Sequence, residues 1–331
     1  MTTTSDTPGP LPPLDPELAA AMAGLPGFGF GEMTVERIPE HRRLIAEFSE
    51  ISDEMLRRDG AYEVSARLVP GPEGAPDIEL LICLPSGVTS PVPAIYHIHG
   101  GGMVLGDNRT GISGMLELAA PHRAAVVSVE YRLAPETPYP GPVEDCYAGL
   151  AWTAKNAAEL RIDPGKIIVG GASAGGGLSA AVALLARDRN GPALAGQMLL
   201  CPMLDDRNNT VSARQTEAGP WNRAANEFGW TALLGDRRGG PDVPPYAAPA
   251  RAADLSGLPP AYIDVGSAET FRDEAVAYAS RLWQAGGAAE LHVWPGGFHA
   301  FAGMVPTAAL SRDAAEAPAK WLRRLLANLD G

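Results

Sequence analysis

The most informative stretch of the chain reads Val169-Gly170-Gly171-Ala172-Ser173-Ala174-Gly175-Gly176. An apolar segment over 166–171, typical of a buried strand, precedes the serine, and an alanine-rich segment, typical of a helix, follows it. In this G-x-S-x-G arrangement the serine projects from a sharp strand-to-helix turn, which closes only if the flanking residues are small. The N–H groups at the start of the helix point toward the same position. The pattern therefore predicts that Ser173 is a nucleophile.

A second glycine run, Gly100-Gly101-Gly102, follows an apolar strand predicted over 94–99. Glycine leaves backbone N–H groups unobstructed, and a serine nucleophile needs such donors to stabilise the charge that develops on the attacked carbonyl oxygen. We predict an oxyanion hole made of the N–H groups of Gly101, Gly102 and Ala174. We expect His99 to anchor this loop through hydrogen bonds, with Gly100 beside it as a structural residue.

Apolar residues near these motifs are candidates for the substrate pocket. Met103, Val104 and Leu105 follow the glycine run, and we expect them to form the wall around the acyl group. Trp221 lies beside a Gly-Pro turn, and aromatic side chains commonly line pockets. We predict that Trp221 faces the substrate, although an aromatic residue here can equally pack within its own segment.

The base should come last in chain order, after the acid. His299 lies in a loop just beyond a strand predicted over 291–294, a usual place for catalytic groups. His292 alternates within that strand, and His41 and His122 lie in polar, helix-like segments without a partner pattern. We therefore predict that His299 is the base.

Four carboxylates compete for the role of the acid, namely Asp264, Glu269, Asp273 and Glu274. Asp264 lies within a strand predicted over 262–266, and the last two lie in a first helical turn, where acids stabilise the helix dipole. Glu269 lies in the loop at the carboxyl end of that strand. We therefore predict that Glu269 orients His299 and stabilises its protonated form.

Two other kinds of site fit parts of the sequence less well. His97 and His99 share a strand face, but two histidines do not complete a metal coordination set. Gly175, Gly177 and Ala180 match a dinucleotide-binding pattern, but they lie inside the predicted helix rather than at its turn. We therefore expect no metal and no cofactor.

These motifs together resemble the bacterial hormone-sensitive-lipase-like esterases of the α/β-hydrolase fold, and within that family the acetyl esterases. The likeness runs from about Leu14 to the end of the chain. The resemblance implies a helical cap above the active site, short acyl chains in the substrate, and a homodimer as a common state. Besides the segments quoted above, the matching ones are Leu14–Leu18, Tyr131–Glu136, Pro138–Pro140, Gly141–Val143, Glu144–Tyr147, Leu204–Arg207, Leu258–Pro260, Phe271–Glu274 and Phe298-His299.

Two residues depart from the family pattern. Ala172 precedes the nucleophile where an aspartate is frequent, so one carboxylate is missing beside the serine. Glu269 takes the position where the family commonly has aspartate, and its side chain is one methylene longer. Neither change removes a member of the triad, but both leave the rate and the pH profile open.

Composition limits the possible partners. The chain has 331 residues, 46% of them apolar, and a formal net charge of -13, which argues against nucleic acid or anionic membranes as partners.

The three cysteines, Cys83, Cys146 and Cys201, show no metal-ligand spacing and indicate reduced thiols of a cytoplasmic protein. No signal peptide and no membrane-spanning segment are expected from the hydropathy pattern.

Strand-like and helix-like segments alternate along most of the chain, which predicts an α/β fold. We expect a mostly parallel eight-stranded sheet with helices on both faces, preceded by helical patterns over 15–22 and 35–58. The predicted organisation is a disordered segment at 1–13, cap helices at 14–58, a core at 59–203 and 257–331, and a cap insertion at 204–256. Ligands of such sheets bind at the carboxyl ends of the strands, where the candidate residues converge.

The sequence thus predicts a serine carboxylesterase that hydrolyses short-acyl, acetyl-like esters of small molecules through an acyl-enzyme. Lactonases, arylformamidases and amidases use the same machinery and remain open, because cap residues select the leaving group. A non-enzymatic receptor on this scaffold is disfavoured, because such receptors lack the catalytic histidine and His299 is present.

Overall fold

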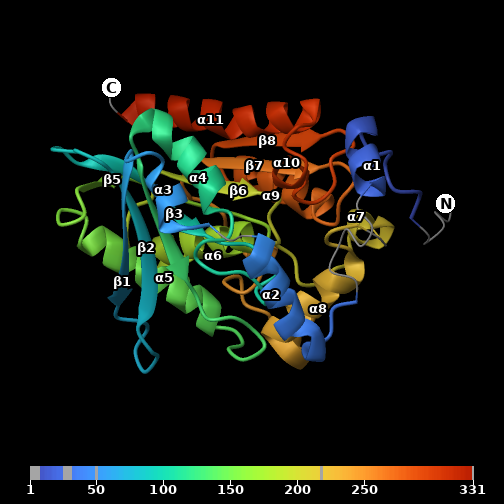
Figure 1. Cartoon of the computed structure of the whole chain (residues 1–331). Coiled ribbons are helices and arrows are strands. Elements are labelled where there is room, and N and C mark those ends of the chain that lie inside the picture. The colour runs from blue at the N-terminus through green and yellow to red at the C-terminus, as the bar shows by residue number, and fades with distance from the viewer. Residues whose placement is uncertain (1–7, 25–31, 49–50, 217–218, 330–331) are drawn as a thin grey trace.

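The computed structural model describes residues 8–24, 32–48, 51–216 and 219–329. Within them, eight strands form one sheet in the order β1-β2-β4-β3-β5-β6-β7-β8 (Figure 1). Only β2 runs opposite to the rest, because it pairs antiparallel with both β1 and β4 while the other neighbours pair in parallel. The mostly parallel eight-stranded sheet is confirmed. The strands are Tyr62–Val69 (β1), Ile78–Pro85 (β2), Val92–Ile98 (β3), Ala125–Glu130 (β4), Ile162–Ala172 (β5), Gly196–Leu200 (β6), Ala261–Gly266 (β7) and Ala289–Trp294 (β8).

Helices cover both faces of this sheet, with α4 and α11 on one face and α5, α6 and α9 on the other (Figure 1). Among the described residues the α-helices are Pro16–Ala23 (α1), Ile38–Phe48 (α2), Asp53–Arg57 (α3), Ile112–Ala119 (α4), Gly141–Lys155 (α5), Ala174–Asp188 (α6), Val211–Gln215 (α7), Arg223–Leu234 (α8), Arg272–Gln284 (α9), Phe301–Met304 (α10) and Ala309–Leu329 (α11). None of them is both long enough and apolar enough to cross a bilayer.

The central strands are apolar on both faces because both faces are covered. Successive residues of β3 alternate between two hydrophobic clusters, so that Ile95 packs with α4 and α11 while Tyr96 packs with α5 and α6. Both side chains are fully buried. This double burial fixes the register of the strands, since a slip by one residue would exchange the two faces.

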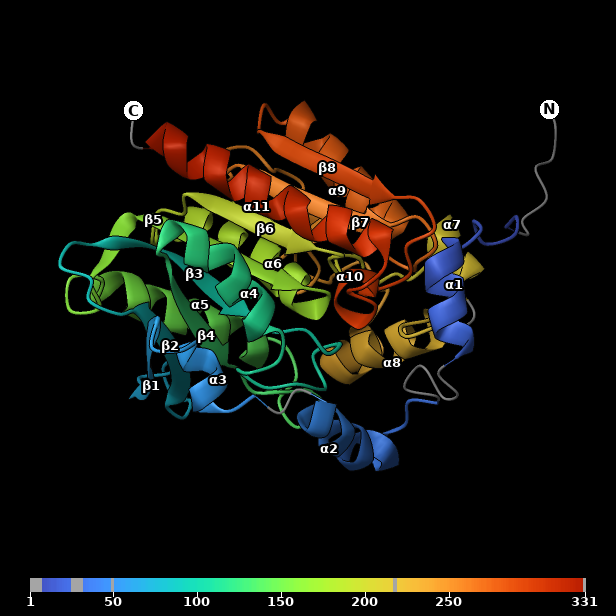
Figure 2. The same ribbon diagram turned by 45° about the horizontal axis from the view of Figure 1, so that its top comes forward.

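Four helices outside these layers gather at one end of the sheet. Figure 2 shows α1, α2, α7 and α8 beyond the carboxyl ends of the parallel strands. Residues 1–7 of the predicted disordered segment lie outside the described residues. Residues 8–13 are placed beside α7, where Gln215 Nε2 donates to the carbonyl oxygens of Gly9 and Pro10 at 3.0 and 2.9 Å.

Candidate active site

Ser173 lies at the junction of β5 and α6, in a strained backbone conformation with φ 59° and ψ −122°. A non-glycine residue rarely adopts a positive φ, and such strain persists only where the surroundings hold it. Here the turn is held by the hydrogen bond from Ser173 N to Leu200 O at 2.8 Å. The turn also requires Gly175, because a Cβ there would lie 2.0 Å from Ile98 O. The sequence pattern thus folds as a sharp turn with Ser173 at the start of the helix, where the residue is 8% exposed.

His299 and Glu269 complete a chain of hydrogen bonds that begins at Ser173. The distance from Ser173 Oγ to His299 Nε2 is 3.0 Å, and that from His299 Nδ1 to Glu269 Oε1 is 3.1 Å. Glu269 is held in turn by the N–H group of Gly266, which donates to Oε2 at 3.1 Å. The arrangement has the order and spacing of a nucleophile, a base and an orienting acid.

The three competing acids, Asp264, Asp273 and Glu274, form hydrogen bonds with residues other than His299. Asp264 accepts from Tyr262 Oη at 3.2 Å, and burial raises its pKa to about 6. Asp273 accepts from Ser212 N at 2.7 Å and from Arg272. Glu274 accepts from Leu204 N at 2.7 Å, and burial raises its pKa well above the usual value. Among the described residues, Glu269 is the carboxylate that contacts His299.

The loop after β3, which carries Gly101 and Gly102, lies against the turn that carries Ser173 and Ala174, since a Cβ on Gly100 would lie 3.6 Å from Ser173 Cβ. Among the residues that the structure describes, none accepts a hydrogen bond from the backbone N–H groups of Gly101, Gly102 or Ala174. Gly102 has a φ of 62°, and a Cβ on it would lie 2.1 Å from Trp221 Cη2. Glycine is required there both by the backbone conformation and by the indole ring packed on it.

His99 fixes this loop. Its Nδ1 lies 2.8 Å from Gly100 O, its ring stacks on that of Tyr131 at 4.1 Å, and Tyr131 Oη donates to His99 O at 3.0 Å. Burial lowers the pKa of His99 to about 4, so the ring is neutral near pH 7. His97 instead pairs with Ser128 Oγ at 3.0 Å. The two histidines therefore have separate hydrogen-bond partners.

A cavity of about 120 Å³ lies next to the His299–Glu269 pair. Trp221 lines it, whereas Met103, Val104 and Leu105 do not. Those three side chains are almost completely buried in the main hydrophobic cluster, because the loop turns back on itself through the hydrogen bond from Leu105 N to Gly101 O. These three residues therefore do not face this cavity, and their role as the wall around the acyl group stays a prediction. The lining residues are Leu11, Leu14, Met22, Thr216, Gly219, Pro220, Trp221, Ala268, Glu269, Phe298 and His299.

Sequence reasoning missed several of these neighbours. Leu11, Leu14 and Met22 reach the cavity from the N-terminal segment, and only tertiary folding brings them there. Phe271 packs edge-on against the His299 ring at 5.1 Å, and Cys201 lies beside the triad. Cys201 directly follows β6 at the carboxyl edge of the sheet, and this position in the sequence could have indicated that it lies near the active site. A larger hollow of about 350 Å³ lies between β8 and α11 and contains no triad residue.

Comparison with known proteins agrees with this geometry. The family described as the alpha/beta hydrolase fold matches residues 95–303. The chain is similar to carboxylesterase NlhH of Mycobacterium tuberculosis, with 39% identity over 72% of this chain and 76% of the relative. Among solved structures it is similar to a bacterial heroin esterase (TM-score 0.86, 41% identity, 95% and 98% coverage). It is also similar to esterase LipW of Mycobacterium marinum (TM-score 0.85, 32% identity, 97% and 98% coverage).

Proposed function

Because the chain belongs to the hormone-sensitive-lipase-like esterases of the α/β-hydrolase family and is a carboxylic ester hydrolase, we propose that it cleaves short-acyl esters through Ser173, His299 and Glu269. The observation that supports this most directly is the continuous hydrogen-bond chain from Ser173 Oγ through both nitrogens of His299 to Glu269.

In the proposed reaction Ser173 Oγ attacks the ester carbonyl while His299 Nε2 accepts the hydroxyl proton. Glu269 keeps the proton of the neutral ring on Nδ1 and stabilises the imidazolium that forms. His299 then gives its proton to the departing alcohol, which leaves an acyl group on Ser173. A water molecule, deprotonated by the same nitrogen, releases the acid and restores the serine.

The N–H groups of Gly101, Gly102 and Ala174 would bind the oxyanion of both tetrahedral intermediates. Their lack of acceptors among the described residues supports this role, because preorganised donors cost no rearrangement when the charge develops. Loss of one such donor typically lowers the rate about 10²–10³-fold.

The proposed preference for acetyl-like groups rests on the size and polarity of the cavity. Its volume of about 120 Å³ is well below the range of roughly 300–1,000 Å³ for pockets that take drug-sized ligands. Leu11, Leu14, Met22 and Trp221 give it apolar walls. We propose that the helices of 14–58 and 204–256 form a cap and that this cap limits the acyl chain.

The proposal is tested by labelling and by a substrate series. A fluorophosphonate probe should label the wild type and a Ser179→Ala variant but not Ser173→Ala. Ser179 is a matched control because it is a buried serine of α6, the helix that follows Ser173, and its hydroxyl donates to Gly175 O. Labelling that persists in Ser173→Ala would reject the nucleophile.

The substrate series consists of p-nitrophenyl esters, a lactone, an N-formylated aromatic amine and an anilide. We expect kcat/KM to be highest for acetyl to butyryl esters and to fall steeply for octanoyl and longer chains. A maximum at long chains would reject the small acyl pocket. Faster turnover of the lactone, formamide or anilide would show that the protein is a lactonase, arylformamidase or amidase rather than an esterase of simple alcohols.

A further inference from the structure

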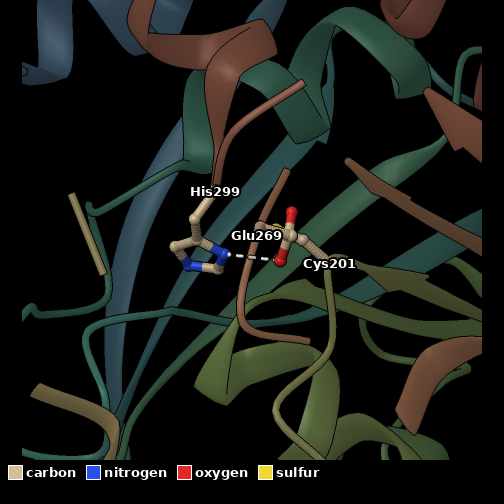
Figure 3. Close-up of side chains that lie close together, drawn as sticks. All are labelled: Cys201, Glu269 and His299. Atoms are coloured by element: carbon tan, nitrogen blue, oxygen red, sulfur yellow. Dashed lines mark hydrogen bonds and ion pairs between the residues drawn. The ribbon is translucent and has the colours of Figure 1, made fainter. Parts of the chain in front are cut away.

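Three metal-ligating side chains meet where β6, β7 and β8 end. Cys201, Glu269 and His299 each offer a donor atom within 4.8 Å of the other two, and all three are buried. Figure 3 shows the side chain of Cys201 reaching toward the edge of the imidazole that faces Glu269. Catalysis as proposed uses the histidine and the glutamate but assigns nothing to the sulfur.

The backbone of Cys201 is fixed at the carboxyl edge of the sheet. Cys201 N donates to Asp264 O at 2.8 Å, and the residue has a φ of 36°. The backbone N–H groups of Ser173 and Ala300 interact with its thiol. Burial raises the pKa of the thiol well above its usual value, and the Glu269 and Asp264 carboxylates raise it further. A protonated, buried thiol reacts poorly with alkylating agents, whereas a metal ion can displace its proton.

We propose that Cys201, Glu269 and His299 form an inhibitory binding site for a thiophilic divalent cation such as Zn²⁺ or Cd²⁺. Sulfur, imidazole nitrogen and carboxylate oxygen are the three ligand types that zinc takes, and water can supply the fourth. Binding forms the metal–sulfur bond and releases the thiol proton to solvent, while the ring proton of His299 moves from Nδ1 to Nε2 so that Nδ1 can bind the ion. The expected separation of ligand atoms around zinc is about 3.3–3.7 Å, close to the 3.1 Å between His299 Nδ1 and Glu269 Oε1.

An ion in this position would block turnover rather than assist it. It would take the carboxylate that orients the ring and bind the ring itself, so that His299 could no longer accept the serine proton. The expected inhibition therefore rests on the proposed catalytic role of His299. The binding of the metal ion by the three side chains is independent of that role.

The first experiment measures inhibition. Chelator-treated protein is titrated with ZnCl₂ and with CdCl₂, and turnover of p-nitrophenyl acetate is followed, with each variant normalised to its own metal-free rate. We expect the wild type to lose most of its activity at micromolar metal and to recover it on adding EDTA. Cys201→Ser should need at least tenfold more metal. Cys83→Ser is the matched control, because Cys83 is also buried but lies in β2, and it should keep wild-type sensitivity.

The second experiment measures binding without catalysis. Co²⁺ bound by a thiolate gives a sulfur-to-cobalt charge-transfer band in the near ultraviolet. The band should saturate at one ion per chain in the wild type, in Cys83→Ser and in the nucleophile variant Ser173→Ala, and should be absent from Cys201→Ser. A band that survives in Cys201→Ser, equal inhibition of that variant, or no metal binding by the wild type would each overturn the proposal. If the wild type has no esterase activity, the proposed function fails while the cobalt band still tests the site.

Discussion

At the scale of single residues, Glu269 makes two hydrogen bonds at once, to the His299 ring and to the N–H group of Gly266. The side chain is 1% exposed, so water cannot replace it as a partner of the ring. Its contribution to the proposed reaction is to select the tautomer of His299 and to stabilise the charge that the ring acquires.

Replacing Glu269 by Gln should lower kcat by about 10²–10⁴-fold, because the amide keeps the shape of the side chain but loses the charge. Measurement of kcat and KM for p-nitrophenyl acetate checks this. Asp273→Asn is the matched control, since Asp273 is a nearby acid whose partners are Ser212 and Arg272, and it should keep most of the activity. The opposite ranking of the two variants would transfer the acid role to Asp273.

Gly102→Ala should lower kcat by about 10²–10³-fold while the protein remains folded, because the added methyl group would displace the loop that carries the proposed oxyanion donors Gly101 and Gly102. The methyl would lie 2.1 Å from Trp221 Cη2, and this indole is buried and donates to Asn226 Oδ1 at 3.3 Å, so it cannot simply move aside. If the contact with the indole is the cause, the Gly102→Ala/Trp221→Ala double variant should lose less activity than the sum of the losses of the two single variants. An active single variant would contradict the oxyanion role of this loop.

Sequence patterns could predict Ser173 and His299 because each stands in a local motif whose backbone form is dictated by glycine and by strand ends. Glu269 needed a positional argument, and the structure separates it from three other acids by their hydrogen-bond partners. Leu11 and Met22 could not be assigned in this way. Their proximity to the triad depends on how distant segments pack, and neighbouring residues in the sequence carry no signal of it. The position of Cys201 directly after a strand indicates the carboxyl edge of the sheet, but not which side chains it contacts there.

At the scale of secondary-structure elements, α2 is tied to the loop that carries two of the proposed oxyanion donors, Gly101 and Gly102. Arg42 Nε donates to Val104 O at 2.9 Å, and the same guanidinium binds Ala134 O and both carboxylate oxygens of Glu136. One side chain thus joins the helix to two loops at the carboxyl edge of the sheet. The planar fork of arginine suits such multiple contacts.

Arg42→Ala should lower the free energy of unfolding by about 1–2 kcal/mol and should lower kcat/KM, because the loop loses its outer support. Urea unfolding and ester turnover measure the two effects. Arg43→Ala provides the comparison, since the Arg43 side chain is 64% exposed and pairs with Glu47 across one helical turn. Equal effects of the two substitutions would show that loss of a surface charge, rather than loss of the tether, is responsible.

The periodicity of the sequence predicted which segments are helices and which are strands. It did not predict where these elements begin and end or which of them lie side by side. The helical pattern over 35–58 is divided into a 3₁₀ turn, α2 and α3, and Ser52 begins α3 by accepting from Met55 N. Polar and apolar residues continue with a helical period across this break, so the pattern could not show it. The position of β4 between β2 and β3 likewise could not be predicted from the sequence, because strand order depends on long-range pairing.

At the scale of the whole molecule, the two hydrophobic clusters on either face of the sheet supply most of the folding free energy, and buried charges oppose it. Glu130, at the end of β4, is a half-buried carboxylate that contributes to this cost. Its Oε2 accepts from Asn108 N at 2.6 Å, and Asn108 also donates to Glu79. Burial raises the pKa of Glu130 from 4.5 to about 7, with smaller raising effects from the Asp107 and Glu79 carboxylates.

Because the folded protein holds the Glu130 proton more tightly than the unfolded chain does, protonation stabilises the fold. This stabilisation is complete below about pH 4.5 and is lost as the pH rises through about 7. Glu130→Gln keeps an oxygen acceptor and carries no charge, so it should raise the unfolding free energy at pH 8 by on the order of 1 kcal/mol and change it little at pH 5. Urea unfolding at both pH values measures this, with the exposed Glu63→Gln as the comparison. If Glu130→Gln were instead destabilising at pH 8, the charged carboxylate would be the form that the fold favours, and its bond from Asn108 N would outweigh the cost of burial.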